Sequence, residues 1–321
     1  MGQINCDTGQ EPKALRVRGM YFSGTGTTET IVRAVAAGLA GKFAQTDTAI
    51  SAEKSPDIDF TPPDTRMKAY RFDDRDIIVF GVPVIAGRVP NVLLPFLSTL
   101  EGDGAIAIPV VLYGNRNFDD ALIELRDILE EQGFHTIAAA AFIGEHSFSR
   151  ILAAGRPDEK DLGIAEQFAA AAGEKLLGFI REAQRQALAL RGGRDPSPEQ
   201  ILEQLRTALE DAGPVPVEGE EPLRPYYKPR DRQGNFINIL KVKPKLNEAK
   251  CTKCGICADI CPMGSIAKDA PGIVSGICIK CCGCEKKCPE GALYFDDPGY
   301  LYHKEELELG YPQRKEPALF L

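Results

Sequence analysis

The chain has 321 residues, of which 44% are hydrophobic and 26% charged, and its formal net charge is −8. The length allows about two domains. The acidic balance argues against a general nucleic-acid partner, no apolar run is long enough to span a membrane, and the first residues lack the apolar segment of an export signal.

Apolar runs alternate with helical patterns over residues 14–192. Strands are predicted at 15–22, 77–84, 105–113 and 136–143. Helices are predicted at 29–41, 92–100, 119–132 and 164–190. This alternation indicates an α/β domain with a doubly wound parallel sheet. Arg16 and Arg18 are unusual in a central strand, which leaves open a later start for the first strand.

A turn of sequence Ser-Gly-Thr-Gly-Thr-Thr, residues 23–28, follows the first predicted strand. Its hydroxyls and backbone N–H groups surround the start of a predicted helix, and it contains no Lys or Arg, so it suits a phosphomonoester held by neutral donors. The turn lacks both the Lys of a Walker loop and the third glycine of a dinucleotide fingerprint. A hydroxyl-rich helix cap without a ligand is the alternative.

The segment Ser23–Glu29 resembles the FMN phosphate loop of flavodoxins, whose pattern (S/T)-x-T-G-x-T-E it matches at every position. Residues 81–90 and 113–120 correspond to the two loops that cover the flavin ring in that family. The resemblance implies a flavodoxin-like sheet of strand order 2-1-3-4-5 over residues 14–192, with ligands at the carboxyl ends of its strands. The implied FMN-binding residues are Ser23, Gly24, Thr25, Gly26, Thr27 and Thr28 for the phosphate, and Pro83, Val84, Ile85, Ala86, Gly87, Arg88, Tyr113, Gly114, Asn115, Phe118 and Asp119 around the ring.

The two ring loops depart from the family in one respect. Flavodoxins commonly stack an aromatic on the flavin from each loop, whereas the first loop here offers Ile85 and no aromatic. At the first loop, the flavin ring is therefore expected either to have an open face or to be covered by the surface of a partner. Arg88 is either a solvated loop charge or a group near flavin N1 or a substrate anion. His146, after the last strand, is either a group that approaches the flavin from this edge of the sheet or an ordinary loop histidine, which is the favoured interpretation.

Residues 193–240 are expected to form a helix and a connector. Ser197–Gln200 opens the helix with a capping-box pattern and a proline at its first position. Its apolar side needs a domain or a second subunit to cover it; the residues on that side are Ile201, Leu202, Leu205 and Leu209. Five prolines between Gly213 and Arg230 predict a stiff, extended connector that fixes the separation of two domains.

Eight of the ten cysteines form two copies of C-x2-C-x2-C-x3-C-P, at 251–262 and 278–289. This is position for position similar to two-cluster bacterial ferredoxins, in which three thiolates bind one [4Fe-4S] cluster and the fourth binds the other. The x3-Cys-Pro segment is expected to open a helix that leads away from the cluster. The predicted ligand sets are Cys251, Cys254, Cys257 and Cys288 for one cluster, and Cys278, Cys281, Cys284 and Cys261 for the other.

Other uses of these cysteines are less favoured. A zinc ribbon needs only two C-x2-C pairs, and a disulfide framework would not repeat one spacing with Pro after each fourth cysteine. Cys282 is interpreted as a spacer thiol and Cys6 as incidental. The pattern places a small α+β ferredoxin domain at residues 241–300, followed by a tail at 301–321 whose apolar end is expected to clamp onto the fold.

The whole chain resembles fused flavodoxin–ferredoxin electron carriers of anaerobic microbes. The resemblance implies an electron-transfer iron–sulfur flavoprotein with FMN and two [4Fe-4S] clusters, acting with a redox partner protein or a small-molecule electron acceptor, in one chain or across a homodimer. Two alternatives are an FMN-dependent reductase of a quinone, disulfide or similar molecule, and a non-catalytic carrier subunit of a larger complex. Thiolate-bound clusters need a reducing compartment, so a cytoplasmic location is expected.

Overall fold

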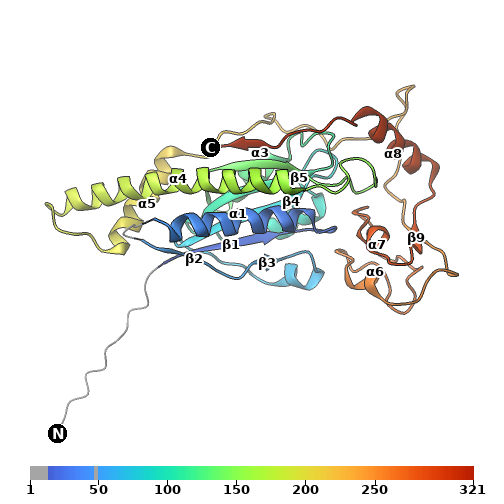
Figure 1. Ribbon diagram of the computed structural model, residues 1–321, viewed down its shortest axis with the longest axis horizontal. Helices are drawn as coiled ribbons and strands as arrows, with labels where there is room; N and C mark the ends of the chain where they lie inside the picture. The colour runs from blue at the N-terminus through green and yellow to red at the C-terminus, as the bar shows by residue number, and fades with distance from the viewer. Residues whose placement is uncertain (1–13, 47–49) are drawn as a thin grey trace, which may run out of the picture.

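The computed structural model describes residues 14–46 and 50–321 (Figure 1). Cys6 lies outside the described residues. Figure 1 shows an α/β layer structure, with the cysteine-containing segment beyond one end of helix α1 and the C-terminal helix α8 next to it. No helix in residues 14–46 and 50–321 is long and apolar enough to cross a membrane.

The sheet of the first half is parallel except at one edge. Its strands are β2 (Ala52–Lys54), β1 (Leu15–Tyr21), β4 (Asp76–Pro83), β5 (Ile106–Tyr113), β7 (Ala139–Ile143) and β10 (Ala318–Phe320), in that spatial order. Two short strands, β3 (Ile58–Asp59) and β6 (His135–Thr136), add to β1 and β5. The five parallel strands β2, β1, β4, β5 and β7 have the order 2-1-3-4-5, which confirms the predicted flavodoxin-like topology.

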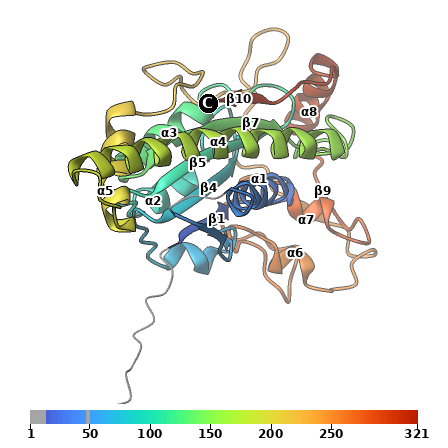
Figure 2. The ribbon, with the colours of Figure 1, turned by 60° about the vertical axis from the view of Figure 1, so that its left-hand side comes forward.

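Helices cover both faces of the sheet (Figure 2). One face carries α1 (Thr27–Ala44), α4 (Glu159–Leu190) and α5 (Pro198–Ala212), which share a single apolar core with alternate residues of the central strands. The opposite face carries η2 (Asn91–Leu93), α2 (Leu94–Leu97) and α3 (Ala121–Glu131), which enclose a second core. A short helix η1 (Pro63–Met67) precedes β4. Strand residues alternate between the two cores because successive side chains of a strand point to opposite faces.

Strand β1 begins at Leu15 despite the arginines that follow it. Arg16 lies opposite Asp76 in the parallel register and donates two hydrogen bonds to its carboxylate, at 3.0 and 2.8 Å. Arg18 lies 3.4 Å from the same carboxylate. Two guanidinium groups on a strand are therefore tolerated because the neighbouring strand supplies a buried carboxylate, and a later strand start is not needed.

Helix α5 packs on its own domain. Its predicted apolar side is buried in the core shared with α1 and α4; these residues are Ile201, Leu202, Leu205 and Leu209. The predicted capping box is present, with the Ser197 N–H donating to the Gln200 side chain over 2.9 Å. The surface that covers this helix is thus in the same chain, and no second subunit is required for it.

A small α+β unit, here called the cysteine module (residues 239–310), follows the connector. It contains β8 (Lys245–Leu246) paired with β9 (Leu293–Tyr294), and three helices, α6 (Ile256–Asp259), α7 (Gly283–Lys286) and α8 (Pro298–Gly310). The predicted domain boundary at residue 300 falls inside α8. Its own small core is formed by Ile239, Cys282, Phe295 and Tyr300.

The prediction that a helix begins at each x3-Cys-Pro segment is wrong. Helix α6 contains Cys257 and ends before Cys261, and α7 contains Cys284 and ends before Cys288. The prolines explain this, because a residue that precedes proline is disfavoured in the helical conformation. Each fourth cysteine therefore ends its helix instead of starting one.

Candidate cofactor sites

The turn at residues 23–28 forms the N-terminus of α1. Gly26 adopts a left-handed conformation with φ 103°, and a Cβ added there would meet no atom within 4 Å. The Ser23 hydroxyl accepts the N–H groups of Gly26 and Glu29, both at 3.1 Å, so it holds the turn closed. The hydroxyls of Thr25 and Thr27 lie 3.4 Å apart.

The backbone N–H groups of this turn are available to a ligand. In the part of the chain that the structure describes, the backbone N–H groups of Thr25, Thr27 and Thr28 donate to no protein acceptor. The first N–H groups of a helix lack intrahelical partners, and together with the helix dipole they attract an anion. Unpaired N–H groups beside two hydroxyls and an open glycine position fit a phosphomonoester.

The first ring loop is a tight turn. Ile85 and Arg88 exchange backbone hydrogen bonds of 3.0 and 3.2 Å, while Ala86 and Gly87 both have positive φ. A Cβ at Gly87 would lie 2.3 Å from the Asp119 carboxylate of the second ring loop. This close approach requires glycine at position 87. It packs the two loops against each other, as expected for loops that leave the same edge of the sheet.

Arg88 is engaged inside the protein and is not a solvated charge. Its guanidinium donates two hydrogen bonds of 2.7 Å to Glu124 and a third, of 2.5 Å, to the backbone oxygen of Arg224 in the connector. The bond to Glu124 raises the pKa of Arg88. The structure therefore places this side chain between α3 and the connector.

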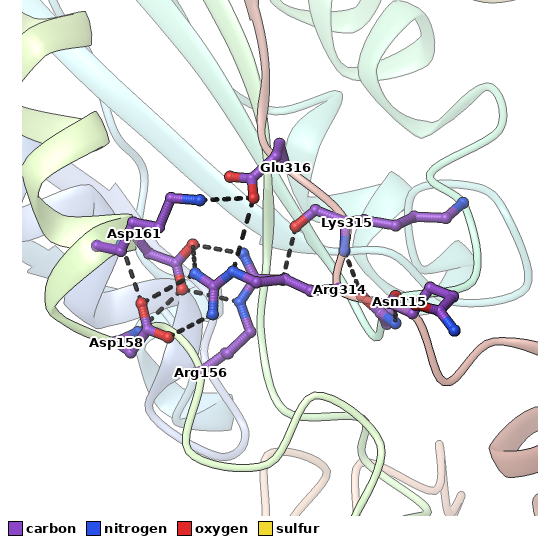
Figure 3. A network of polar contacts seen from close by, with 9 residues as sticks. Asn115, Arg156, Asp158, Asp161, Arg314, Lys315 and Glu316 are labelled. Carbon is purple, nitrogen blue, oxygen red and sulfur yellow. Dashed lines mark hydrogen bonds and ion pairs between the residues drawn. The ribbon is translucent and has the colours of Figure 1, made fainter.

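The second ring loop is covered by the C-terminal tail (Figure 3). Asn115 is 2% exposed, and its amide donates to the backbone oxygens of Tyr311 and Gln313 at 2.7 and 2.8 Å. Tyr113 and Phe118 lie in the core, with ring centroids 5.7 Å apart. Neither aromatic of this loop is therefore displayed at its surface.

A network of ion pairs fixes the tail beyond this point (Figure 3). Arg156 and Asp161 form a buried pair, and Arg156 also donates to the backbone oxygen of Lys315 at 2.8 Å. Arg314 pairs with Asp158 at 2.6 Å, and this pairing lowers the pKa of Asp158. Strand β10 then adds to β7, so the expectation that the tail clamps onto the fold is confirmed.

His146 lies against the second ring loop. A Cβ at Gly114 would come within 2.3 Å of the imidazole. Burial lowers the pKa of His146 to about 3, and its Nδ1 accepts the N–H of Phe148 at 3.1 Å, so the side chain is neutral. This agrees with the interpretation of His146 as a loop histidine that packs the protein.

Two cavities lie in the cysteine module. The first is lined by Cys261, Cys278, Cys281 and Cys284, and also touches Cys282. The second is lined by Cys251, Cys254, Cys257 and Cys288. In each cavity three cysteines of one sequence run meet the fourth cysteine of the other run, which is the crossed grouping that the ferredoxin resemblance implies.

Several of these sulfurs accept hydrogen bonds from the backbone, and the two cavities differ in burial. Backbone N–H groups donate to Cys251, Cys261 and Cys288 over 3.3–3.4 Å. Hydrogen bonds to ligand sulfurs and solvent exposure both tune cluster potentials. The two cavities differ in exposure, since Cys254 is exposed whereas burial raises the pKa of the Cys281 thiol to about 11.

Cys282 directs its sulfur elsewhere. Its Sγ lies 3.3 Å from the backbone oxygen of Lys280 and 3.4 Å from the Tyr300 hydroxyl. Burial raises the pKa of this thiol, which is 1% exposed in the core with Phe295 and Tyr300. The side chain contributes to the small core of the module, in keeping with a spacer position between ligands.

The two candidate sites touch each other. A Cβ at Gly24 of the phosphate turn would lie 2.9 Å from Cβ and 3.2 Å from Sγ of Cys281. A Cβ at Gly283 would lie 2.5 Å from the Gly24 backbone oxygen. Arg66 of η1 donates to the Pro262 backbone oxygen, which adds a second contact between the flavodoxin-like half and the module. Glycine at both positions permits this close packing.

Sequence reasoning missed several residues around the ring loops. Tyr227 of the connector donates its N–H to Ala86 at 2.8 Å, and its ring centroid lies 6.0 Å from that of His303. Phe148 lies between His146 and His303, with centroids 5.3 and 6.2 Å away. These residues come from three separate segments, so no spacing in the sequence could group them.

A family model described as a 4Fe-4S binding domain matches residues 244–267, which include the first cysteine run. The C-terminal region holds a 4Fe-4S binding domain. Together with the strand order of the sheet, this confirms the predicted combination of a flavodoxin-like first half and an iron–sulfur region.

Among solved structures, a flavodoxin from the domain Archaea is 15% identical with a TM-score of 0.35, over 50% of this chain and 97% of that one. A Streptococcus pneumonia flavodoxin is 20% identical with a TM-score of 0.31, over 49% and 98% of the two chains. An NADH:FMN oxidoreductase in its apo form is 15% identical with a TM-score of 0.33, over 50% and 90%. No curated protein matches the chain.

Proposed function

We propose that the protein is an electron-transfer iron–sulfur flavoprotein that passes electrons between two [4Fe-4S] clusters and FMN. The contact between Gly24 and Cys281 carries this proposal, because it joins the phosphate turn to the wall of a cysteine cavity. The bound groups supply the redox chemistry, while the chain holds them in place and tunes them.

The cluster ligands are the four cysteines that line each cavity. Cys261, Cys278, Cys281 and Cys284 form the inner site, next to the phosphate turn, and Cys251, Cys254, Cys257 and Cys288 form the outer site. The exposed Cys254 makes the outer site the natural point of exchange with a redox partner protein. Electrons then pass through the inner site to the flavin or in the opposite direction.

The FMN phosphate is held by the N–H groups and hydroxyls at residues 23–28, and the ring lies at the two loops that follow β4 and β5. The connector and the tail cover parts of both loops, through Tyr227 on Ala86 and through Tyr311 and Gln313 on Asn115. A small-molecule reductase needs substrate access to the ring, so this cover favours electron transfer through the clusters. The clusters also favour a reducing, cytoplasmic setting.

Cofactor analysis and a kinetic experiment test the proposal. Anaerobically purified protein is expected to contain about eight irons and eight sulfides per chain. The flavin released by denaturation is expected to be FMN, at about one per chain, because the phosphate turn carries no dinucleotide fingerprint. Stoichiometric zinc, a single cluster after full reconstitution, or FAD would refute the assignment.

In the kinetic experiment, electrons are delivered to the clusters by rapid mixing with a limiting reductant, and flavin reduction is followed by absorbance. The contact at Gly24 predicts a transfer rate that does not depend on protein concentration. A rate that rises in proportion to concentration would mean that the two sites meet only by collision between molecules, and the proposed internal path would be wrong.

A further inference from the structure

The ring loops lack an aromatic side chain of their own at the surface. The first loop offers Ile85, and in the second loop Tyr113 and Phe118 are each 6% exposed and packed in the core. A planar isoalloxazine ring is best held by a flat apolar face. If FMN binds as proposed above, that face has to come from another segment of the chain.

The connector is that segment, because it is anchored across both loops. Asp120, at the start of α3, accepts hydrogen bonds from the N–H and the guanidinium of Arg224, and this pairing lowers the pKa of Asp120 to about 2. The Tyr226 hydroxyl donates to the backbone oxygen of Val89 at 2.8 Å. The Tyr227 N–H donates to the backbone oxygen of Ala86, also at 2.8 Å.

The ring of Tyr227 is held from the second loop. The Arg116 guanidinium carbon lies 4.5 Å from its centroid, a cation–π contact, and Arg116 also pairs with Asp119. His303 of α8 flanks the same ring, with the planes 30° apart. Tyr227 remains 40% exposed, so part of the ring is available for a further contact.

The geometry points to Tyr227 as the aromatic residue that contacts the flavin ring, with Arg116 as its positioning residue. This inference rests on the proposed FMN site. The connector thus supplies the aromatic face that the first loop lacks. This face comes from the same chain, whereas the sequence also allowed a partner surface in this role. Since the face of an aromatic ring is electronegative, Tyr227 disfavours the negative charge that a flavin gains on reduction.

Three variants test the inference in the full-length, cluster-loaded protein. Tyr227→Leu removes the aromatic face, Tyr227→Phe keeps it, and Phe236→Leu makes the same kind of change at an exposed aromatic residue further along the connector, whose ring packs against Arg230. FMN is titrated into flavin-depleted protein, and its affinity, its fluorescence quenching and its midpoint potential are measured. Iron content and far-ultraviolet circular dichroism report whether each variant is folded.

Tyr227→Leu is expected to weaken FMN binding about tenfold, to lose much of the quenching and to raise the midpoint potential. Tyr227→Phe is expected to retain all three properties, and Phe236→Leu to change affinity much less than Tyr227→Leu. Wild-type affinity, quenching and potential in Tyr227→Leu, or equal losses in Phe236→Leu, would overturn this inference alone. Wild-type protein that does not bind FMN would overturn the proposed function, and this inference with it.

Discussion

Lys286 is the side chain whose removal most directly tests the docking of the two sites. It lies on α7 between Cys284 and Cys288, yet its Nζ reaches into the flavodoxin-like half. There it donates to the Glu145 carboxylate at 2.5 Å and to the backbone oxygens of His146 and Ser149 at 2.7 and 2.8 Å. The bond to Lys286 helps to hold the pKa of Glu145 below its usual value.

Lys286→Met is expected to weaken this docking by about 2–4 kcal/mol, because it leaves a carboxylate and two carbonyls without their donor. This expected loss is smaller than that for breaking a fully buried ion pair. The reason is that the Glu145 side chain is 28% exposed and that of Lys286 is 11% exposed. The expected results are a lower midpoint in urea for the loss of cluster absorbance and slower electron transfer from the clusters to the flavin.

Lys287→Met is the matched control, because it removes the same charge one residue away, next to Cys288, from an exposed side chain. It is expected to leave both the urea midpoint and the transfer rate close to those of the wild type. Any general effect of lysine charge on the clusters would appear in both variants. Equal behaviour of the two variants in both assays would refute the docking role of Lys286.

Three further outcomes are expected. Cys282→Ser should retain about eight irons, because the Cys282 sulfur lies beside Tyr300, whereas Cys284→Ser should lose about four; equal iron losses would contradict the ligand assignment. Thr25→Val combined with Thr27→Val should weaken FMN binding by about 1.5–3 kcal/mol for each hydrogen bond lost to the phosphate, as measured by fluorescence titration, and an unchanged dissociation constant would exclude these hydroxyls. Burial lowers the pKa of His303 to about 4, so the unfolded chain binds the extra proton below pH 6.5 and stability falls with decreasing pH; in urea titrations His303→Phe should reduce the loss of stability between pH 7 and pH 5 by about 2 kcal/mol, with the loss due to His146 remaining, and a loss equal to that of the wild type would exclude a contribution from His303.

The longer elements could be predicted from sequence because their patterns are strong. The predicted strands at 77–84 and 105–113 agree with β4 and β5 to within one residue at each end. The second strand of the sheet was implied only by the family resemblance. It consists of β2 and β3, which are three and two residues long, and Glu53, Lys54 and Asp59 give them no apolar alternation.

The two cavities are lined by the cysteine sets that the ferredoxin resemblance implies, while the role of these cysteines as cluster ligands stays a prediction. What sequence could not supply is the placement of one module on the other. The Gly24–Cys281 approach joins segments that are more than two hundred residues apart, as residue numbers 24 and 281 show. No sequence pattern around Gly24 or Cys281 predicts such a contact.

The connector shows a different reason for incomplete prediction. Its prolines predicted a stiff spacer, but proline content describes only the chain's local freedom. Its position is set by side chains that bind the domain, above all Arg224 on Asp120 and Tyr226 on Val89. Hydrogen bonds to the first domain, and not stiffness alone, therefore determine where the connector runs.

The carboxyl edge of the sheet explains why connector, module and tail converge on one place. Parallel strands leave their loops and the N-terminus of α1 at that edge, where backbone N–H groups carry partial positive charge. A thiolate-bound cluster and a phosphate are both anionic, so packing them together would be unfavourable without compensation. The N-terminus of α1 supplies part of it at the phosphate turn. Direct docking of the cysteine module on the phosphate turn is thus electrostatically feasible. The connector that the chain provides is long enough for it.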